Sequence, residues 1–183
     1  AILPEINSDQ RLYLRDAFHP LLLLSNRERG EKTWPQTIEL HPENHIIVIS
    51  GPNAGGKSVC LKTVGLLQYM LQCGMLIPVR ETSEAGIFRD IFIDIGDEQS
   101  IENDLSTYTS HLKNIKHFTL KAGKKTLFLI DEFGTGTEPQ LGGAIAEAVL
   151  EHLNKKQAYG VVTTHYANLK LLADKTPGLI NGA

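Results

Sequence analysis

The sequence predicts an α/β fold in which a mainly parallel sheet is flanked by helices, with a small antiparallel part at the N-terminus. Three apolar runs predict the sheet, because strands that are buried on both faces show no polar alternation. These runs are residues 45–50, 126–130 and 158–163. Segments with helical periodicity separate the runs, and this alternation of strands and helices is typical of a parallel sheet.

The other elements follow from local composition and periodicity. A helix is expected over residues 58–72, with Gly74 as its C-terminal stop. Ser106 is placed to cap a further helix that carries large side chains at helical spacing. These side chains are Tyr108, Leu112, Ile115 and Phe118. The remaining segments, in chain order, are expected to form a surface turn at 27–35, a strand at 37–40, a turn at 41–44, a strand at 87–95, a polar loop at 97–105, and helices at 141–153 and 168–173.

Length and composition predict one globular domain. The chain has 183 residues, of which 42% are hydrophobic and 21% are charged. This length is enough for one sizeable core, so we expect a single domain over residues 1–183. No apolar run approaches the length of a membrane span, and we expect no membrane partner. The two cysteines, Cys60 and Cys73, belong to no metal-type cluster, which favours two reduced thiols in a cytoplasmic protein.

The formal net charge is -3. A chain that binds DNA mainly by neutralising phosphates is usually basic. Any contact with nucleic acid is therefore expected to be local, indirect, or carried by other parts of a longer protein.

The strongest motif is a phosphate-binding loop, residues 51–58, between the first buried strand and the helix that follows it. Gly51, Gly56, Lys57 and Ser58 fill the pattern G-x-x-x-x-G-K-[ST]. The glycines let the backbone bend around phosphate oxygens, and the helix start adds its positive end. Lys57 is expected to reach the β- and γ-phosphates of ATP, and the Ser58 hydroxyl to ligate Mg²⁺. The expected nucleotide contacts also include Pro52, Asn53, Ala54, Gly55 and Val59.

Two acidic residues, Asp131 and Glu132, end the second buried strand. Ligands of parallel sheets bind beyond the carboxyl ends of the strands. Asp131 is therefore expected to help hold Mg²⁺. Glu132, one residue further on, is expected to face the attacking water as general base. Without the phosphate-binding loop, a catalytic role and an interpretation as two solvent-exposed acids at a strand end would be equally well supported.

His165 follows the third buried strand. If this strand lies in the same sheet, the imidazole projects toward the γ-phosphate, where it can donate a hydrogen bond. A single histidine at a strand end is more often structural. The functional interpretation is favoured here because two other strand ends already converge on a phosphate.

Together these motifs resemble the ATPase domain of the MutS family, which belongs to the ABC class of P-loop ATPases. The resemblance rests on residues 51–58, on Asp131-Glu132-Phe133-Gly134-Thr135-Gly136-Thr137, and on Thr163-Thr164-His165-Tyr166. Residues 94–101, residues 105–112 and the Gly-Thr-Gly-Thr-Glu-Pro run at 134–139 are similar to the type-two branch. The resemblance covers nearly the whole chain.

The resemblance implies further roles that the residues alone do not. Ser106, with Thr107, occupies the place of the ABC signature, whose helix start faces the γ-phosphate bound by a partner subunit, so a homodimer is implied. Residues 134–137 match a loop that touches the partner's site. Either Gln99 or Asp97 corresponds to a metal- and water-sensing residue. An apolar or aromatic side chain near residues 18–24 would hold the adenine.

The family also sets limits and leaves alternatives. Its members are much longer and act on branched or mismatched DNA, so we expect the chain to be a piece of such a protein, with clamp and nuclease functions elsewhere. One alternative is another ABC ATPase, such as a transporter motor, although that class would show Leu-Ser-Gly-Gly-Gln where this chain has Leu-Ser-Thr-Tyr-Thr at 105–109. The other alternative is a nucleotide-switched binding module with little turnover.

Overall fold

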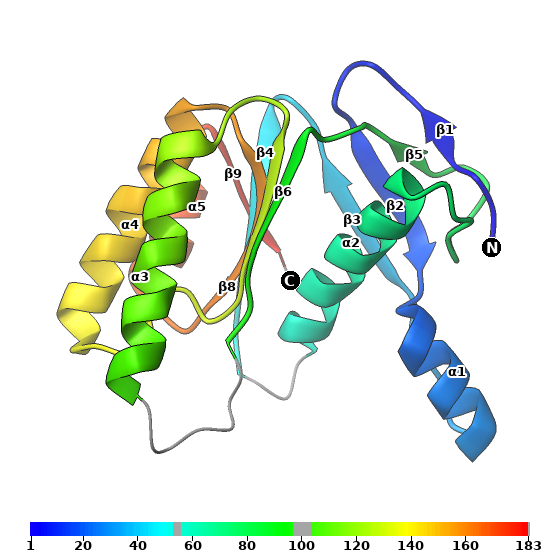
Figure 1. Ribbon diagram of the computed structural model, residues 1–183, viewed down its shortest axis with the longest axis horizontal. Coiled ribbons are helices and arrows are strands. Elements are labelled where there is room, and N and C mark those ends of the chain that lie inside the picture. Colours follow the sequence, from blue (N-terminus) through cyan, green and yellow to red (C-terminus); the bar gives the residue numbers. More distant parts are fainter. Residues whose placement is uncertain (53–55, 97–103, 183) are drawn as a thin grey trace.

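The computed structural model describes residues 1–52, 56–96 and 104–182, and for residues 104–107 it describes the backbone alone. Within these ranges the chain forms a central parallel sheet, a smaller mixed sheet and five helices (Figure 1). No helix in this part of the chain combines the length and the apolar character that crossing a bilayer requires.

The central sheet has five strands, and every neighbouring pair is parallel, as the sequence predicts. In spatial order the strands are β6 (Asp90–Asp94), β7 (Thr126–Ile130), β8 (Tyr159–Thr164), β4 (Asn44–Ser50) and β9 (Gly178–Gly182). All residues of β7 and β8 are buried. The three apolar runs therefore form the three adjacent inner strands.

Helices cover both faces of this sheet. Figure 1 shows α3 (Asp104–Lys121), α4 (Pro139–Lys155) and α5 (Ala167–Lys175) on one face and α2 (Lys57–Gln72) on the other. Successive side chains of a strand point to opposite faces, so Leu127 and Leu129 pack in the core beneath α2 while Phe128 and Ile130 pack beneath α3 and α4.

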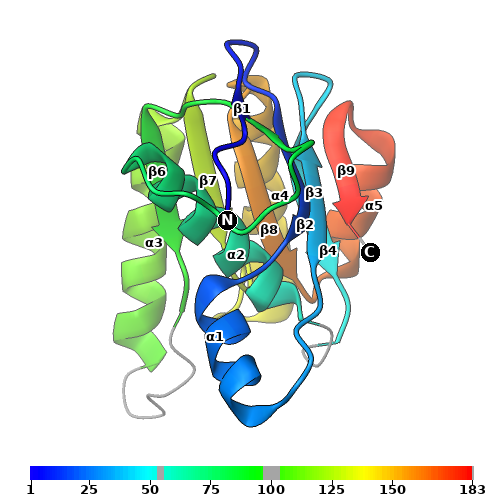
Figure 2. The ribbon, with the colours of Figure 1, turned by 90° about the vertical axis from the view of Figure 1, so that its right-hand side faces the viewer.

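The smaller sheet lies beyond α2 (Figure 2) and has the order β1-β5-β2-β3. Its strands are β1 (Glu5–Ile6), β5 (Glu84–Ala85), β2 (Leu12–Ala17) and β3 (Gln36–Leu40). β2 is antiparallel to both β3 and β5, which confirms the small antiparallel part, whereas β1 runs parallel to β5.

Several predicted boundaries need correction. The prediction of a surface turn at 27–35 is wrong for its first residues, because α1 (Pro20–Arg29) extends through residue 29. Pro20 begins this helix, and Gly30 ends it in the left-handed conformation with φ 71°. The strand expected at 87–95 is limited to β6, since only residues 90–94 pair with β7. β9 is not among the elements predicted from the sequence.

Helix α3 begins at Asp104, inside the segment expected to be a polar loop. Ser106 therefore lies within the first turn of α3 and is not its cap, which corrects the predicted boundary. The preceding residues, 97–103, lie outside the described ranges.

Candidate functional site

Parallel pairing brings the carboxyl ends of β4, β7 and β8 to one edge of the central sheet, where α2 also begins (the lower edge in Figure 1). The residues predicted to act on a nucleotide follow directly after these strands. Their meeting at one edge is a consequence of the fold, since adjacent parallel strands end on the same side.

The start of α2 is suited to bind an anion. Gly56 precedes the helix in the left-handed conformation with φ 76°, and Gly51 has φ 141°; glycine adopts both without strain. No side chain among the described residues caps this helix start, and the first turn contains no acidic residue. The N–H groups of the first turn therefore face the loop region with a positive helix end behind them. Asn53, Ala54 and Gly55 lie outside the described residues.

Lys57, the first residue of α2, is buried, with 6% of its surface exposed. Its Nζ donates a hydrogen bond to the carbonyl oxygen of Gly51 and lies 3.5 Å from His165 Nδ1. A buried ammonium group needs a compensating anion or hydrogen bonds. The Gly51 carbonyl meets part of this need, and a bound phosphate would meet the rest.

Ser58 and Asp131 bring two oxygen ligands together beside Lys57. The Ser58 hydroxyl donates to Asp131 Oδ1 over 3.0 Å. Among the described residues no group of three or more His, Cys, Asp or Glu side chains is arranged to hold a metal. This donor set fits Mg²⁺, which is usually held by one or two protein oxygens while water and substrate phosphates supply the other ligands.

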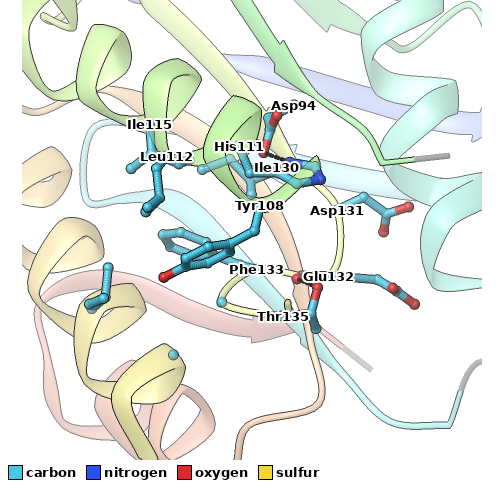
Figure 3. A pocket seen from close by; sticks show the side chains of 13 residues that line it. Asp94, Tyr108, His111, Leu112, Ile115, Ile130, Asp131, Glu132, Phe133 and Thr135 are labelled. Atoms are coloured by element: carbon cyan, nitrogen blue, oxygen red, sulfur yellow. Dashed lines mark hydrogen bonds and ion pairs between the residues drawn. The ribbon is translucent and has the colours of Figure 1, made fainter. Parts of the chain in front are cut away.

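Glu132 has an unusual backbone conformation, with φ 50°. A left-handed conformation costs a residue other than glycine about 1–2 kcal/mol. Three hydrogen bonds maintain it: Glu132 N–H donates to Thr163 Oγ1 over 2.7 Å, and its carbonyl accepts from the hydroxyl of Thr135 over 2.9 Å and from the Thr135 N–H over 3.2 Å. In Figure 3 the side chains of Asp131 and Glu132 extend toward the same side, away from Tyr108.

His165 lies between Lys57 and the carboxylate of Glu132. Its Nε2 is 3.6 Å from Glu132 Oε1, and its Nδ1 is the atom near Lys57. The His165 side chain is 40% exposed and that of Glu132 is 32% exposed. Both groups can therefore be reached from solvent.

A small pocket of about 40 Å³ lies behind these carboxylates, between α3, α4 and the end of β7 (Figure 3). One water molecule needs about 10–15 Å³ of such space, so this pocket has room for only a few waters and is too small for a nucleotide. A nucleotide bound to this chain would therefore have to lie elsewhere, and Asp131 contacts Ser58 at the start of α2.

The loop after Glu132 packs closely against two helices. The Tyr166 hydroxyl donates to the carbonyl of Gly134 over 3.0 Å. Gly134 has φ 89°, and a Cβ built there would lie 2.7 Å from the carbonyl oxygen of Gly142 in α4. A Cβ on Gly142 would lie 2.2 Å from the Gly134 oxygen. Neither position has room for a side chain.

Sequence reasoning missed a buried polar cluster that fastens α3 to the sheet. Asp94, at the end of β6, is 5% exposed and accepts hydrogen bonds from His111 Nδ1 over 2.7 Å and from Asn114 Nδ2 over 2.8 Å. Its carbonyl also accepts from the Asp131 N–H over 2.9 Å. The available signal was a carboxylate inside the apolar run Ile93-Asp94-Ile95. Thr163 was likewise given no role of its own.

Some predicted site residues are not placed in detail. Asp97 and Gln99 lie outside the described residues, as does the side chain of Ser106. The segment suggested for adenine, residues 18–24, leads into α1. There the pKa of His19 is lowered, first by burial and then by the positive charge of Lys62 on α2. This segment therefore lies near α2, and no single adenine contact is defined.

Comparison with known proteins agrees with the motifs. The family model described as MutS domain V matches residues 47–182. Proteins named endonuclease MutS2 are similar over almost the entire chain: that of Enterococcus faecalis is 46% identical over 183 residues, that of Geobacillus kaustophilus is 46% identical over 180, and that of Thermomicrobium roseum is 48% identical over 180. The matches cover 100%, 98% and 98% of this chain.

The chain spans 22% of the length of each of these relatives. Their shared name agrees with the type-two branch that residues 94–101 and 134–139 indicate. The match to domain V begins inside β4 and includes the phosphate-binding loop, both acidic residues and His165. From the extent of this match, the chain belongs to the MutS family.

Proposed function

We propose that this chain is a P-loop ATPase domain of the ABC class, which binds Mg²⁺-ATP at the open edge of the central sheet and hydrolyses its γ-phosphate. One observation carries the proposal: His165 lies 3.5 Å from Lys57 and 3.6 Å from Glu132. Three groups therefore lie close together at the start of α2: a cation that can bind phosphates, a carboxylate that can take a proton from water, and an imidazole that can donate a hydrogen bond.

Each group has a role that its position supports. Lys57 and the first N–H groups of α2 would bind the phosphates, with Gly51 and the rest of the loop around them. Ser58 and Asp131 would hold Mg²⁺, which when bound neutralises charge on the phosphate oxygens. Glu132 would take a proton from the attacking water. His165 would donate a hydrogen bond to the γ-phosphate, where negative charge develops.

We further propose that the site is completed by a second copy of the chain. Ser106 lies in the first turn of α3, far in sequence from residues 51–58, and in the family that the sequence resembles this helix start faces the γ-phosphate bound by a partner subunit. A helix start presented by a partner would supply donors to that phosphate. We propose that hydrolysis in such a homodimer drives the DNA transactions of the intact protein. We also propose that the intact protein is cytoplasmic.

The test of a shared site is the dependence of rate on protein concentration. Phosphate release per subunit should rise with concentration, because dimer formation completes the site. Ser106→Arg should suppress hydrolysis by crowding the contact, while ATP affinity measured by calorimetry stays close to that of the parent chain.

Mixing two inactive variants gives the sharper result. In a dimer of Ser106→Arg with Glu132→Gln, one site combines an intact Glu132 with an intact Ser106 from the partner. The mixture should therefore recover part of the parent rate, which neither variant shows alone. If mixed dimers form, as shown by mass measurement, but no activity returns, Ser106 does not act across the dimer.

DNA binding by this chain alone is expected to be weak or absent at physiological salt, because the net charge of -3 offers no broad basic surface. Fluorescence anisotropy with labelled duplex and branched DNA would measure this. Tight, salt-sensitive binding would contradict the prediction. It would point to the exposed lysines at the end of α3 and beyond it, Lys121, Lys124 and Lys125, which charge-reversal variants would then test.

A further inference from the structure

Thr163 lies on the strand next to β7, and its side chain contacts both Asp131 and Glu132. Among the described residues it is the one polar side chain on a neighbouring strand that does so. Thr163 belongs to β8 and has no exposed surface. Its hydroxyl donates a hydrogen bond to Asp131 Oδ1 and accepts one from the Glu132 N–H over 2.7 Å. Its carbonyl accepts from the Phe133 N–H over 2.8 Å.

These contacts begin where regular strand pairing ends. The last paired residues of β7 and β8 are Ile130 and Val162. Beyond them the chain turns at Glu132 into the left-handed conformation. The Glu132 N–H then has no strand carbonyl opposite it, and the Thr163 hydroxyl accepts its hydrogen bond instead. A buried N–H without a partner would destabilise this turn.

We propose that Thr163 is a positioning residue, whose single hydroxyl sets the carboxylate of Asp131 and the backbone of Glu132 relative to each other. A hydroxyl can donate and accept at the same atom, and both functions are used here. Valine has nearly the same shape but offers neither, whereas serine offers both.

We expect loss of the Thr163 hydroxyl to affect the rate of hydrolysis more than the affinity for ATP. Asp131 Oδ1 is also the acceptor for Ser58, so loss of the Thr163 hydroxyl would leave this oxygen held from the α2 side only. Glu132 would lose the hydrogen bond that fixes its N–H. Groups that orient ligands and bases in this way typically change metal affinity or activity by about 10-fold to 100-fold when they are removed. Lys57 makes no contact with Thr163 among those observed, so its interaction with phosphate should persist.

The experiment compares three variants: Thr163→Val, Thr163→Ser and, as the matched control, Thr164→Val. Thr164 is the next residue in β8 and is equally buried, but its hydroxyl accepts from the Tyr166 N–H over 3.0 Å and contacts neither carboxylate. The first measurement is the amide proton shift of Glu132 in ¹H–¹⁵N NMR spectra of the chain without nucleotide or metal. The second is single-turnover ATP hydrolysis with protein in excess, as a function of Mg²⁺ concentration.

Thr163→Val should move the Glu132 amide proton upfield, because a short hydrogen bond to that proton is lost. It should also lower the hydrolysis rate, or raise the half-saturating Mg²⁺ concentration, by about 10-fold to 100-fold, while ATP affinity without Mg²⁺ is retained. Thr163→Ser should restore the shift and the rate, and Thr164→Val should leave the Glu132 shift at the value of the parent chain.

The kinetic part rests on the proposed ATPase function, and the NMR part does not. A parent chain that fails to hydrolyse ATP would contradict the proposed function alone. An unchanged Glu132 shift in Thr163→Val would overturn the positioning role, whatever the rate. Equal loss in Thr163→Ser, or an equal change of the Glu132 shift in Thr164→Val, would also overturn it, because the effect would then reflect packing of β8 and not the hydroxyl of Thr163.

Discussion

Replacing Glu132 with glutamine is expected to lower the rate of ATP hydrolysis by about a hundredfold or more, since a general base typically contributes at least this much. The amide keeps the shape of the side chain but cannot take a proton from water. ATP should still bind, because Lys57 and the start of α2 are unchanged. With hydrolysis blocked, the ATP-bound dimer should accumulate. Single-turnover hydrolysis and the mass of the complex in the presence of ATP would measure the two effects.

A suitable control is Glu151→Gln, on an exposed position of α4. It removes the same charge from the chain and should leave hydrolysis unchanged. If Glu132→Gln hydrolyses ATP at the parent rate, Glu132 is not the base. If the variant loses ATP binding as well, its role is in binding and not in proton transfer.

Replacing Lys57 with alanine should abolish measurable ATP binding. The ammonium group is buried beside the phosphate-binding loop, so the phosphates would lose a desolvated positive partner. Truncating one member of a buried charge pair typically costs about 2–5 kcal/mol of binding free energy. Calorimetry with a slowly hydrolysed ATP analogue would measure this loss.

The matched control for this change is Lys155→Ala, at the exposed end of α4, which should bind the nucleotide like the parent chain. Thermal unfolding of both variants without nucleotide would separate loss of a ligand contact from loss of folding. Nucleotide affinity equal to that of the parent in Lys57→Ala would contradict the assignment of residues 51–58 as the phosphate site.

The parts of the fold that could be predicted are those in which local pattern and final environment agree. β7 was predicted with its final bounds, because a run buried on both faces is uniformly apolar. The positions of Lys57, Asp131 and His165 followed from three such runs, since parallel strands end at one edge.

The missed elements depend on information that is not local. The leucines of α1 are consecutive, at residues 21–24, so they do not form the one-sided apolar stripe by which helices are usually detected, and α1 buries none of its residues. β9 contains two glycines and an asparagine in five residues, and it becomes a strand through pairing with β4.

The same distinction applies to the candidate site. The phosphate-binding loop is contiguous, so a motif reveals it. The hydrogen bonds of Thr163 join residues that are 31 and 32 positions apart. Those of Asp94 with His111 and Asn114 cross from β6 to α3. Such contacts are set by which face of each strand meets its neighbour, and no spacing rule along the chain predicts them.

The tight packing of Gly134 against Gly142 has a mechanical consequence. Two backbone segments in direct contact, with the Tyr166 hydroxyl bonded to one of them, leave no slack that a small displacement could take up. A push on the loop after Glu132 would therefore be transmitted to α4 and to the start of α5 as movement of whole helices. The loop after Glu132 and the first turn of α4 are therefore expected to move together as one packed unit.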